Sequence, residues 1–597
     1  MVVPRPLILA ALAAALAVAP AAAAATTPTL PVYDKFGHVV QTPFAPAAAP
    51  THLDASRATA SFLADPKVAA WLRRYPPRPQ TQATYKDGNW TVNVWSGKAG
   101  EIATGTVQDA SGAVTEAWTG PQVAWRMARG YEGAFGGKRI NSYPVWLGFC
   151  AVFLLGLADW RRPLSLRNLD LLVLLSFSVS LWFFNRGQVF ESAIAAYPPL
   201  LYLLWRALHA TRRNRGAHAS RPLWPVWLLA AATIFLVGFR IGLNVRDSNV
   251  IDVGYAGVIG ADRIWHGQMP YGHFPVEDDL KPCGPADSTG EIRDRIQTNG
   301  RCESANPLGD TYGPVAYAAY LPGYWALGWS GKWDDLPAVH FTSILWDVIA
   351  IVGLFLVGRR YGGIRLAVTL AFAWAAYPFT QYASMSNTND SIMPALLVWG
   401  FWLASRPGAR GVFCALAGWT KFASFAVAPL WLTYPERKPL RHPARFLAGF
   451  LVATLVSLSV LALEPSLLHA ARVFWDRTVW TQVTRHSPFS LWDWGQYHAQ
   501  GIPSLHVEQR VLAGVLVAGA IAAAFFPRRK SPLQLAALTA ALLVGLQLVL
   551  TYWIYLYIPW FFPFAAFVVL APAAVRAEAA ASEAEDERGV PQLVAAG

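Results

Sequence analysis

An arginine and two aspartates follow directly on an apolar run in the middle of the chain. The run covers Leu223–Leu243, and Arg246, Asp247 and Asp252 come just after it. Because an apolar run of about 20 residues is long enough to span hydrocarbon, we expect these side chains at the membrane–water boundary. A carboxylate there can act as a general base on a lipid-linked or surface substrate. Alternatively, Asp247 or Asp252 caps the helix expected over Gly254–Trp265.

A lysine interrupts the apolar block Gly411–Pro435 near its middle. Placing Lys421 inside hydrocarbon costs about 2.5–3.5 kcal/mol, so such a residue usually has a functional partner. A lipid phosphate is one such partner, and the alternative is that the side chain snorkels to the interface. Further along the chain, the segment VTRHSPFSLWDWG is either a plain interfacial segment or a source of phosphate and sugar contacts, from Arg485 and His486.

Polar and aromatic residues in similar positions are candidates for binding sugar. Asn389 and Asp390, in the motif SNTND, lie between two apolar runs, where a plain turn is an equally simple explanation. Tyr255, Tyr271 and Tyr312 belong to a larger set of aromatic residues near the polar segments. Sugars stack on such rings, but tyrosine and tryptophan are also enriched where a membrane meets water.

Four cysteines exclude a disulfide-dense scaffold and a cysteine-rich zinc site. Cys283 and Cys302 fall in one polar stretch, and a disulfide closing it would contribute about 3 kcal/mol. The acidic run Glu277–Asp279 could hold a divalent cation, although a solvated charge run explains it more simply. No other cluster has metal-ligand spacing, and no glycine-rich phosphate loop occurs, so we expect no cofactor.

The composition indicates the class of protein. Of the 597 residues, 54% are hydrophobic and 14% are charged, whereas a soluble chain carries about 25% charged residues. Long, continuous apolar runs predict an all-α polytopic membrane protein and exclude a transmembrane β-barrel. The net charge of +13 is spread in short Lys and Arg clusters between these runs. That distribution is typical of cytoplasmic anchors and argues against nucleic acid as a partner.

The apolar runs predict about 11 to 14 transmembrane or re-entrant helices. The spans are Tyr143–Trp160, Leu169–Phe184, Ile194–Leu208, Leu223–Leu243, Val339–Gly358, Leu366–Gln381, Ile392–Ala404, Phe446–Leu463, Val511–Phe526, Pro532–Thr551 and Tyr555–Val575. Two further blocks, 312–329 and 411–435, are either re-entrant hairpins or full crossings. We prefer hairpins, because they keep every arginine cluster on the cytoplasmic side.

The two arrangements of block 411–435 place its lysine differently. In a hairpin, Lys421 lies at the outer tip, in one cavity with Asp252 and close to Asp390. In a full crossing, Lys421 lies near the middle of the bilayer and needs a buried carboxylate, for which Asp347 is the candidate.

The regions around this membrane core differ in composition. Residues 51–140 are polar, with helical spacing and four strand candidates, and predict a small extracytoplasmic α+β domain with a faint similarity to PepSY-type domains. A lid without chemistry is the alternative. The remaining regions are a signal sequence or uncleaved anchor at 1–25, a linker at 26–50, three additional helices at 141–222, a core at 223–575 with outer loops 244–311 and 464–510, and a disordered cytoplasmic tail at 576–597.

Several motifs of the core resemble one family. DVGYAGVIGADRIWHGQMPYG after an acidic residue, then TYGPVAYAAYLPG, SNTND and GWTKF, are similar to segments of GT-C superfamily glycosyltransferases, in particular family 87-like polyprenol-phosphate mannosyltransferases. The resemblance covers residues 223–575. It implies a GT-C-like membrane fold with Asp252 as the catalytic base. The three helices and the outer domain before residue 223 are not part of the family's common core.

The resemblance implies transfer of a hexose, with mannose as the candidate, from a polyprenyl-phosphate donor to a lipid or glycan acceptor of the cell envelope. The reaction would proceed with inversion on the outer face of a bacterial-type plasma membrane, where the N-terminal domain would also lie. A transporter or flippase for a lipid-linked or small solute is the alternative, although no internal repeat is visible. A noncatalytic sensor or anchor would not need the long polar loop Asn244–Thr311.

Overall fold

The computed structural model describes residues 51–212, 224–277, 279–286, 292–436 and 440–571, together with short pieces between residues 32 and 41. The chain forms two compact units: the first comprises residues 1–66, 81–93 and 105–117, and the second comprises the rest. The predicted signal sequence, most of the linker and the tail at 576–597 lie outside the described residues.

The N-terminal region contains the four predicted strands. They form one sheet in the order β3 (Gln80–Lys86), β4 (Asn89–Trp95), β5 (Glu101–Gln108) and β6 (Val114–Thr119). In the first unit, helix α2 (Ala55–Ala64) begins at Asp54, whose side chain accepts a hydrogen bond from the Arg57 amide. Alternating burial along β4 and β5 supplies Val92 and Val107 to the core beside Phe62 of α2. A small α+β region therefore precedes the membrane helices. A separate pair, β1 (Val32–Tyr33) and β2 (Val39–Gln41), is antiparallel.

The second unit is a helical membrane region. Its described part has six helices that are long and apolar enough to cross a membrane: α7 (Leu166–Phe184), α9 (Val226–Asp247), α13 (Pro337–Ala376), α18 with its 3-10 extension (Arg441–Leu463), α21 (His506–Phe525) and α22 (Pro532–Val549). The other predicted spans include the shorter helices α6 (Tyr143–Leu157), α15 (Ile392–Trp402) and α23 (Ile558–Leu570), and the longer, polar-ended α8 (Val189–Arg212). Helix α13 bends at Gly363, where φ is 71°, and this bend separates the two spans predicted there.

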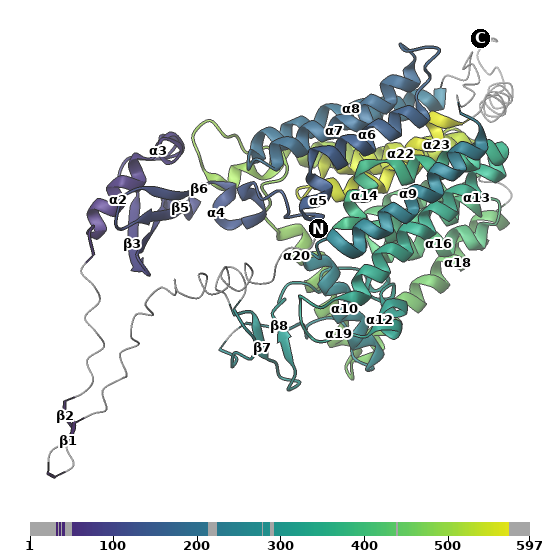
Figure 1. Cartoon of the computed structure of the whole chain (residues 1–597). Helices are drawn as coiled ribbons and strands as arrows, with labels where there is room; N and C mark the ends of the chain where they lie inside the picture. The colour runs from purple at the N-terminus through teal and green to yellow at the C-terminus, as the bar shows by residue number, and fades with distance from the viewer. Residues whose placement is uncertain are drawn as a thin grey trace, which may run out of the picture. The chain divides into compact units, whose positions relative to one another are not determined.

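Helices α7, α8, α22 and α23 pack beside one another, as do α9, α13 and α15 (Figure 1). The side chains of α23 are buried along its whole length, including Phe561, Phe562 and Phe564, so this helix lies inside the bundle. In contrast, α18 and α21 expose rows of leucine and valine, as expected for helices that face lipid.

Block 411–435 folds back on itself. Helix α16 (Pro407–Thr420) ends at Lys421, and η4 (Phe422–Val427) with α17 (Ala428–Leu432) returns toward its start. The Arg410 guanidinium donates to the Trp431 and Tyr434 carbonyls at 2.9 and 2.7 Å, so the two ends of the block lie together. The hairpin arrangement is therefore present and the full crossing is wrong. Block 312–329 likewise consists of two short helices, α11 (Pro314–Ala318) and α12 (Leu321–Leu327).

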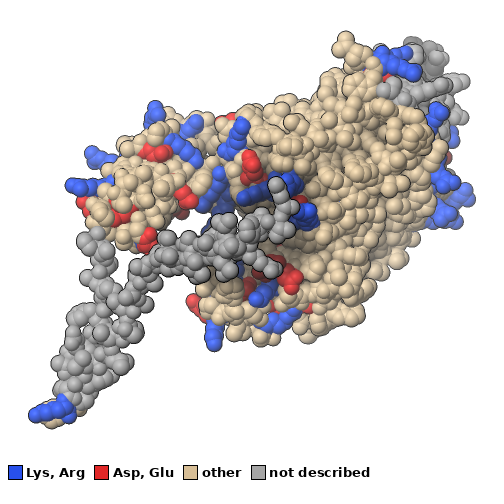
Figure 2. Space-filling view, viewed as in Figure 1, with Lys and Arg blue, Asp and Glu red and all other residues tan. Residues whose placement is uncertain are grey.

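The basic connections meet at the end of the region opposite to Lys421. Arg360 donates to Ser405 Oγ at 2.7 Å, and the Lys530 amide donates to the Pro435 carbonyl at 2.7 Å. Figure 2 shows Lys and Arg side chains at the right-hand end of the membrane region, beyond a broad belt that is almost free of charge. We refer to this side as the basic end.

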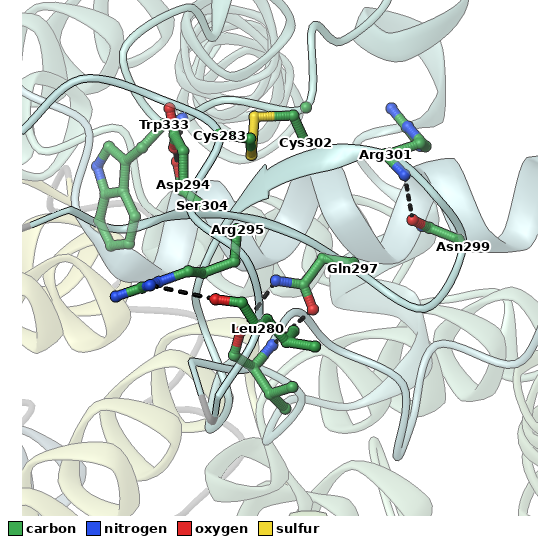
Figure 3. Close-up of a disulfide and its surroundings, with 12 residues drawn as sticks. Leu280, Cys283, Asp294, Arg295, Gln297, Asn299, Arg301, Cys302, Ser304 and Trp333 are labelled. Carbon is green, nitrogen blue, oxygen red and sulfur yellow. Dashed lines mark hydrogen bonds between the residues drawn. A yellow bond between two sulfur atoms is a disulfide. The ribbon is translucent and has the colours of Figure 1, made fainter. Parts of the chain in front are cut away.

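The polar loop before α13 is built on helix α10 (Asp252–Trp265). A Cβ atom at Gly257 or Gly260 would lie about 2.4 and 2.2 Å from the rings of Tyr320 and Tyr317, so both positions need glycine for this helix to pack so closely. Farther along the loop, β7 (Asp294–Ile296) pairs with β8 (Cys302–Ser304), and a disulfide joins Cys283 to Cys302 (Figure 3).

Candidate active site

A cavity of about 470 Å³ opens at the Lys421 end of the membrane region. Its walls come from the start of α10, the turn before α11, η3 (Asn389–Ser391), the tip of the 411–435 hairpin, the segment around α20 (Thr481–Thr484) and the residues between α22 and α23. Its lining combines apolar side chains with polar ones, which include Asp252, Tyr312, Asp390, Lys421, Gln482 and Arg485.

Lys421 and Asp390 form an ion pair on one wall of this cavity. The Lys421 ammonium lies 3.0 Å from Asp390 Oδ1, and the two side chains are 10% and 1% exposed. Trp560 Nε1 donates to the same carboxylate at 3.0 Å. The ammonium also lies over the rings of Tyr312, Tyr557 and Trp560, at 4.8, 5.7 and 5.7 Å.

These contacts hold the lysine without using all of its donors. An ammonium carries three N–H groups, and aromatic faces attract a cation without accepting all of them. One donor is directed to Asp390, and the cavity is adjacent. Lys421 can therefore bind an anion that enters the cavity while Asp390 continues to orient it.

Asp252 is the first residue of α10, and its side chain is exposed to the cavity. Burial within the protein raises the pKa of Asp252 above its usual value, while Arg485 and Lys421 oppose this shift and Asp390 adds to it. Among the described residues, no cation lies within ion-pair distance of Asp252. Asp252 accepts a hydrogen bond from the Val253 amide but, among the described residues, is not paired with a cation as Asp390 is, and we therefore call it an open carboxylate.

Arg485 follows α20 and lines the cavity. Its guanidinium carbon lies 3.9 Å from the centre of the Tyr552 ring and 5.7 Å from that of Trp125. A cation–π contact of this kind contributes about 0.5–2 kcal/mol. A guanidinium carries five N–H donors, so donors remain for an anion that enters the cavity.

Five of the predicted site residues therefore meet in one cavity: Asp252, Tyr312, Asp390, Lys421 and Arg485. They come from segments far apart in the chain, and the hairpin tip, the helix start and the interfacial segment reach the same end of the bundle.

The other predicted site residues do not line the cavity. Asp247 lies 3.9 Å from Arg139 at the end of α9, beside an exposed Arg246. Asn389 is buried behind the wall next to Asp390. His486 points outward, with its ring 3.1 Å from Asp493. Asn389 and His486 are sequence neighbours of the lining residues Asp390 and Arg485 but do not line the cavity themselves.

Two predicted tyrosines support the cavity from behind. The Tyr271 hydroxyl donates to the Tyr312 carbonyl at 2.9 Å and thus helps to place the Tyr312 ring. The Tyr255 hydroxyl donates to the Ser304 carbonyl at 2.6 Å, and its ring stacks on Trp333 at 4.6 Å. Both side chains are fully buried. They therefore hold the loop rather than offering a surface to a ligand.

Sequence reasoning missed part of the aromatic wall. Tyr552, Tyr557 and Trp560 line the cavity, and Trp560 orients Asp390. They belong to the run YWIYLYIPWFF, whose composition is equally typical of residues at a membrane–water interface. The run leads into α23, the buried helix, and aromatic residues beside such a helix are poor candidates for a lipid-facing belt.

The described residues contain no group of three or more His, Cys, Asp or Glu side chains that could hold a metal ion. Within the acidic run, Asp278 lies outside the described residues, so the structure does not describe the whole run.

Comparison with known proteins finds one family model that matches part of the chain. Residues 311–552 match the model of glycosyltransferase family 87. Tyr312, Asp390, Lys421 and Arg485 fall within the match, and Asp252 precedes it. Among solved structures, ArnT from Cupriavidus metallidurans bound to undecaprenyl phosphate is similar, at 16% identity and a TM-score of 0.38. The match covers 61% of this chain and 62% of that one, so the chain spans about three fifths of that structure's length. No curated protein matches the chain. Residues 311–552 of this membrane protein are therefore a region similar to glycosyltransferase family 87.

Proposed function

We propose that this protein transfers a hexose, with mannose as the candidate, from a polyprenyl-phosphate donor to a hydroxyl group of a cell-envelope acceptor. The observation that carries the proposal is the single cavity that holds an open carboxylate, Asp252, together with two cations, Lys421 and Arg485. Such a cavity can bind both the phosphate of a lipid-linked sugar donor and the hydroxyl group of an acceptor. The phosphate needs cations, and the attacking hydroxyl needs a base.

The cations bind the phosphate of the donor in this mechanism. Lys421 is held by Asp390 and three aromatic rings, and Arg485 by Tyr552, so both are oriented before the donor arrives. Negative charge grows on the phosphate as the bond from the sugar carbon breaks. Preorganised cations in a site that excludes water stabilise that charge most strongly.

Asp252 removes the proton of the acceptor hydroxyl. The acceptor oxygen forms a bond to the anomeric carbon as the bond from that carbon to the phosphate oxygen breaks on the opposite face, which inverts the configuration. The proton goes to Asp252, and polyprenyl phosphate leaves with the electron pair of the broken bond. The raised pKa of Asp252 suits this role, because a base is most effective when its pKa approaches the working pH.

The polyprenyl chain occupies the apolar side of the cavity. Leu546, Val549 and Leu550 at the end of α22, with Ile554, form part of the lining. Each buried CH₂ group contributes about 0.8 kcal/mol, so a short apolar groove is enough to hold the lipid.

The reaction takes place at the outer face of a bacterial-type plasma membrane. Lys421 lies at the tip of the hairpin, and the arginines lie at the basic end, opposite to the cavity. Because Lys and Arg clusters favour the cytoplasmic side, the cavity faces outward. The segment that leads into α6 includes the cavity-lining Phe135, so the chain enters α6 from the cavity side, and we propose that the N-terminal domain is extracytoplasmic as well.

A transfer assay tests the proposal. Purified full-length protein in lipid nanodiscs receives radiolabelled polyprenyl-phosphate mannose and a crude envelope acceptor, and the label in the acceptor is counted. We expect Asp252→Asn to abolish transfer. Asp247→Asn is the matched control, because Asp247 also follows α9 but lies outside the cavity, and it should keep wild-type transfer. Full transfer by Asp252→Asn would refute the role of this base.

A further inference from the structure

One wall of the cavity comes from a segment that lies far outside the family match. The segment Pro121–Phe135 contains α4 (Pro121–Ala124) and η2 (Arg126–Arg129), and it precedes the first membrane helix. Its residues Met127 and Phe135 line the cavity. The family match begins at residue 311. We refer to the segment as the N-terminal strap.

The strap is attached to the turn between α7 and α8. Gln122 Nε2 donates to the Gly187 carbonyl at 2.9 Å. Gly130 has φ 86°, and a Cβ there would lie 2.9 Å from the Arg186 backbone, so only glycine permits this approach. At its other end, Asn141 Nδ2 donates to the Phe135 carbonyl at 2.9 Å. The strap is therefore held at both ends.

Between these attachments, Trp125 contacts the aromatic support of Arg485. Its ring lies 6.0 Å from Tyr552 and 5.4 Å from Phe489, and the Arg485 guanidinium lies 5.7 Å from its centre. Arg485 and Tyr552 both line the cavity, whereas Trp125 is not among its lining residues. Trp125 thus stands behind the cation and limits where it can move.

We propose that Trp125 is a positioning residue for glycosyl transfer: it holds Arg485 against Tyr552 so that the guanidinium faces the cavity of Asp252. The strap is accordingly part of the active site, although the family region does not contain it. This inference rests on the proposed function for its catalytic consequence, but the position of Arg485 can be measured without any substrate.

The position of Arg485 has a measurable effect on Asp252. The groups that face Asp252 are Arg485, Lys421, Asp390 and the tyrosines 312, 552 and 557. Burial raises the pKa of Asp252, and Arg485 is the neighbouring group that lowers this pKa most. When Arg485 is displaced, that pKa rises further. A base must be ionised to act, so the acidic limb of the pH–rate profile moves to higher pH.

The first experiment measures Arg485 directly. Full-length protein in nanodiscs is treated with phenylglyoxal, and modified arginines are quantified by mass spectrometry. In Trp125→Ala we expect Arg485 to be modified several times faster than in the wild type, whereas Trp125→Phe keeps the wild-type rate. Trp182→Ala is the matched control, because Trp182 stacks on the Arg186 guanidinium at 3.6 Å, whereas the strap approaches only the Arg186 backbone, and neither residue lines the cavity. It should release Arg186 and leave Arg485 unchanged.

The second experiment measures the pH dependence of transfer. Trp125→Ala should lower the plateau rate roughly tenfold, since small misplacements of a binding group are costly, and move the acidic limb to higher pH. Trp125→Phe should restore both, and Trp182→Ala should change neither. In an Arg485→Gln background, Trp125→Ala should add no further shift, because both changes then act through the same side chain.

The outcomes separate this inference from the proposed function. Unchanged Arg485 modification in Trp125→Ala overturns the positioning role, whatever the protein transfers. Faster Arg485 modification without transfer from polyprenyl-phosphate mannose by the wild type leaves the positioning role standing and overturns the proposed donor. Equal shifts for Trp125→Ala in both backgrounds also contradict the inference.

Discussion

Two ion pairs of the described membrane region share their chemistry but differ in how completely their hydrogen-bonding groups are used. Arg240 on α9 and Asp347 on α13 form the first pair, with Arg240 Nε 2.9 Å from Asp347 Oδ2. Thr380 and the Ala375 carbonyl accept further bonds from Arg240, and Trp374 donates to Asp347. Both charged groups of this pair thus have further hydrogen-bond partners, and we call the pair closed.

The second pair, Lys421 with Asp390, has fewer hydrogen-bonding partners, and we call it open. Its cation is surrounded by aromatic faces, and a cavity lies beside it. A charge inside a membrane region is therefore not by itself a sign of function. A charge with spare donors next to a cavity can bind a ligand, whereas a saturated pair can only join helices. Asp347 is already bonded to Arg240 and Trp374, and it is not the partner of Lys421.

The largest effect should follow from breaking the closed pair. Asp347→Leu leaves the Arg240 guanidinium buried without its carboxylate, and such a loss costs about 3–5 kcal/mol. We expect a much lower unfolding temperature in detergent, with transfer per folded molecule unchanged.

Its control removes both charges. The double variant Arg240→Met with Asp347→Leu should regain most of the stability, because replacing a buried pair by apolar groups is close to neutral. A single variant as stable as the wild type would show that the closed pair does not join α9 to α13.

The open pair should respond in the opposite way. Lys421→Gln removes the charge but keeps a hydrogen-bond donor for Asp390, which also lines the cavity, so stability should fall less than in Asp347→Leu. Transfer should fall by about 10²–10³-fold in kcat/KM, as expected when a preorganised group that stabilises developing charge is lost.

Lys421→Arg is the companion variant, and it should recover part of the rate because it restores the charge with a different shape. Normal transfer by Lys421→Gln would rule out phosphate binding by Lys421.

A smaller effect should come from the donor that orients Asp390. Trp560→Phe removes the N–H that lies 3.0 Å from the carboxylate and keeps most of the ring. Hydrogen bonds to charged groups contribute about 1.5–3 kcal/mol, so we expect KM for the lipid donor to rise at least tenfold. Steady-state kinetics with varied donor measure this. Unchanged KM would mean that Asp390 is held by Lys421 alone.

The smallest effect concerns pH. Burial raises the pKa of Asp252, and transfer requires its ionised form. The rate should therefore fall as the pH drops, beginning above the range of an ordinary carboxyl group, whose pKa is about 3.9. A profile of kcat/KM between pH 4 and 9 measures this limb. A rate that stays constant down to pH 4 would contradict a base with a raised pKa.

Much of the membrane architecture was predictable from local patterns. Apolar runs indicated the helices, and the arginine clusters favoured the hairpin at 411–435. Asp252 and Lys421 stood out because an ionisable residue beside or within an apolar run is costly and thus informative. Alternation and turn residues likewise predicted the four strands before the membrane region.

Other features of the site could not be predicted, because they depend on side chains that meet across many residues. Tyr255, Tyr271 and Tyr312 looked alike in the sequence, but packing buried the first two and exposed the third to the cavity. The contact of Trp125 with Tyr552 joins residues more than four hundred positions apart, and no local pattern indicates it.

The sequence by itself thus determined which segments enter the membrane and which charges are expensive there, because both follow from the transfer of individual groups out of water. Tertiary structure decided which of those charges are closed and which are open. Arg240 and Lys421 both lie among apolar neighbours, and only the placement of Thr380, Trp374 and the cavity distinguishes them. Hydrogen-bond saturation is a property of the assembled fold, since the groups of the Arg240–Asp347 pair and its partners come from α9, α13 and α14 (Pro378–Met385).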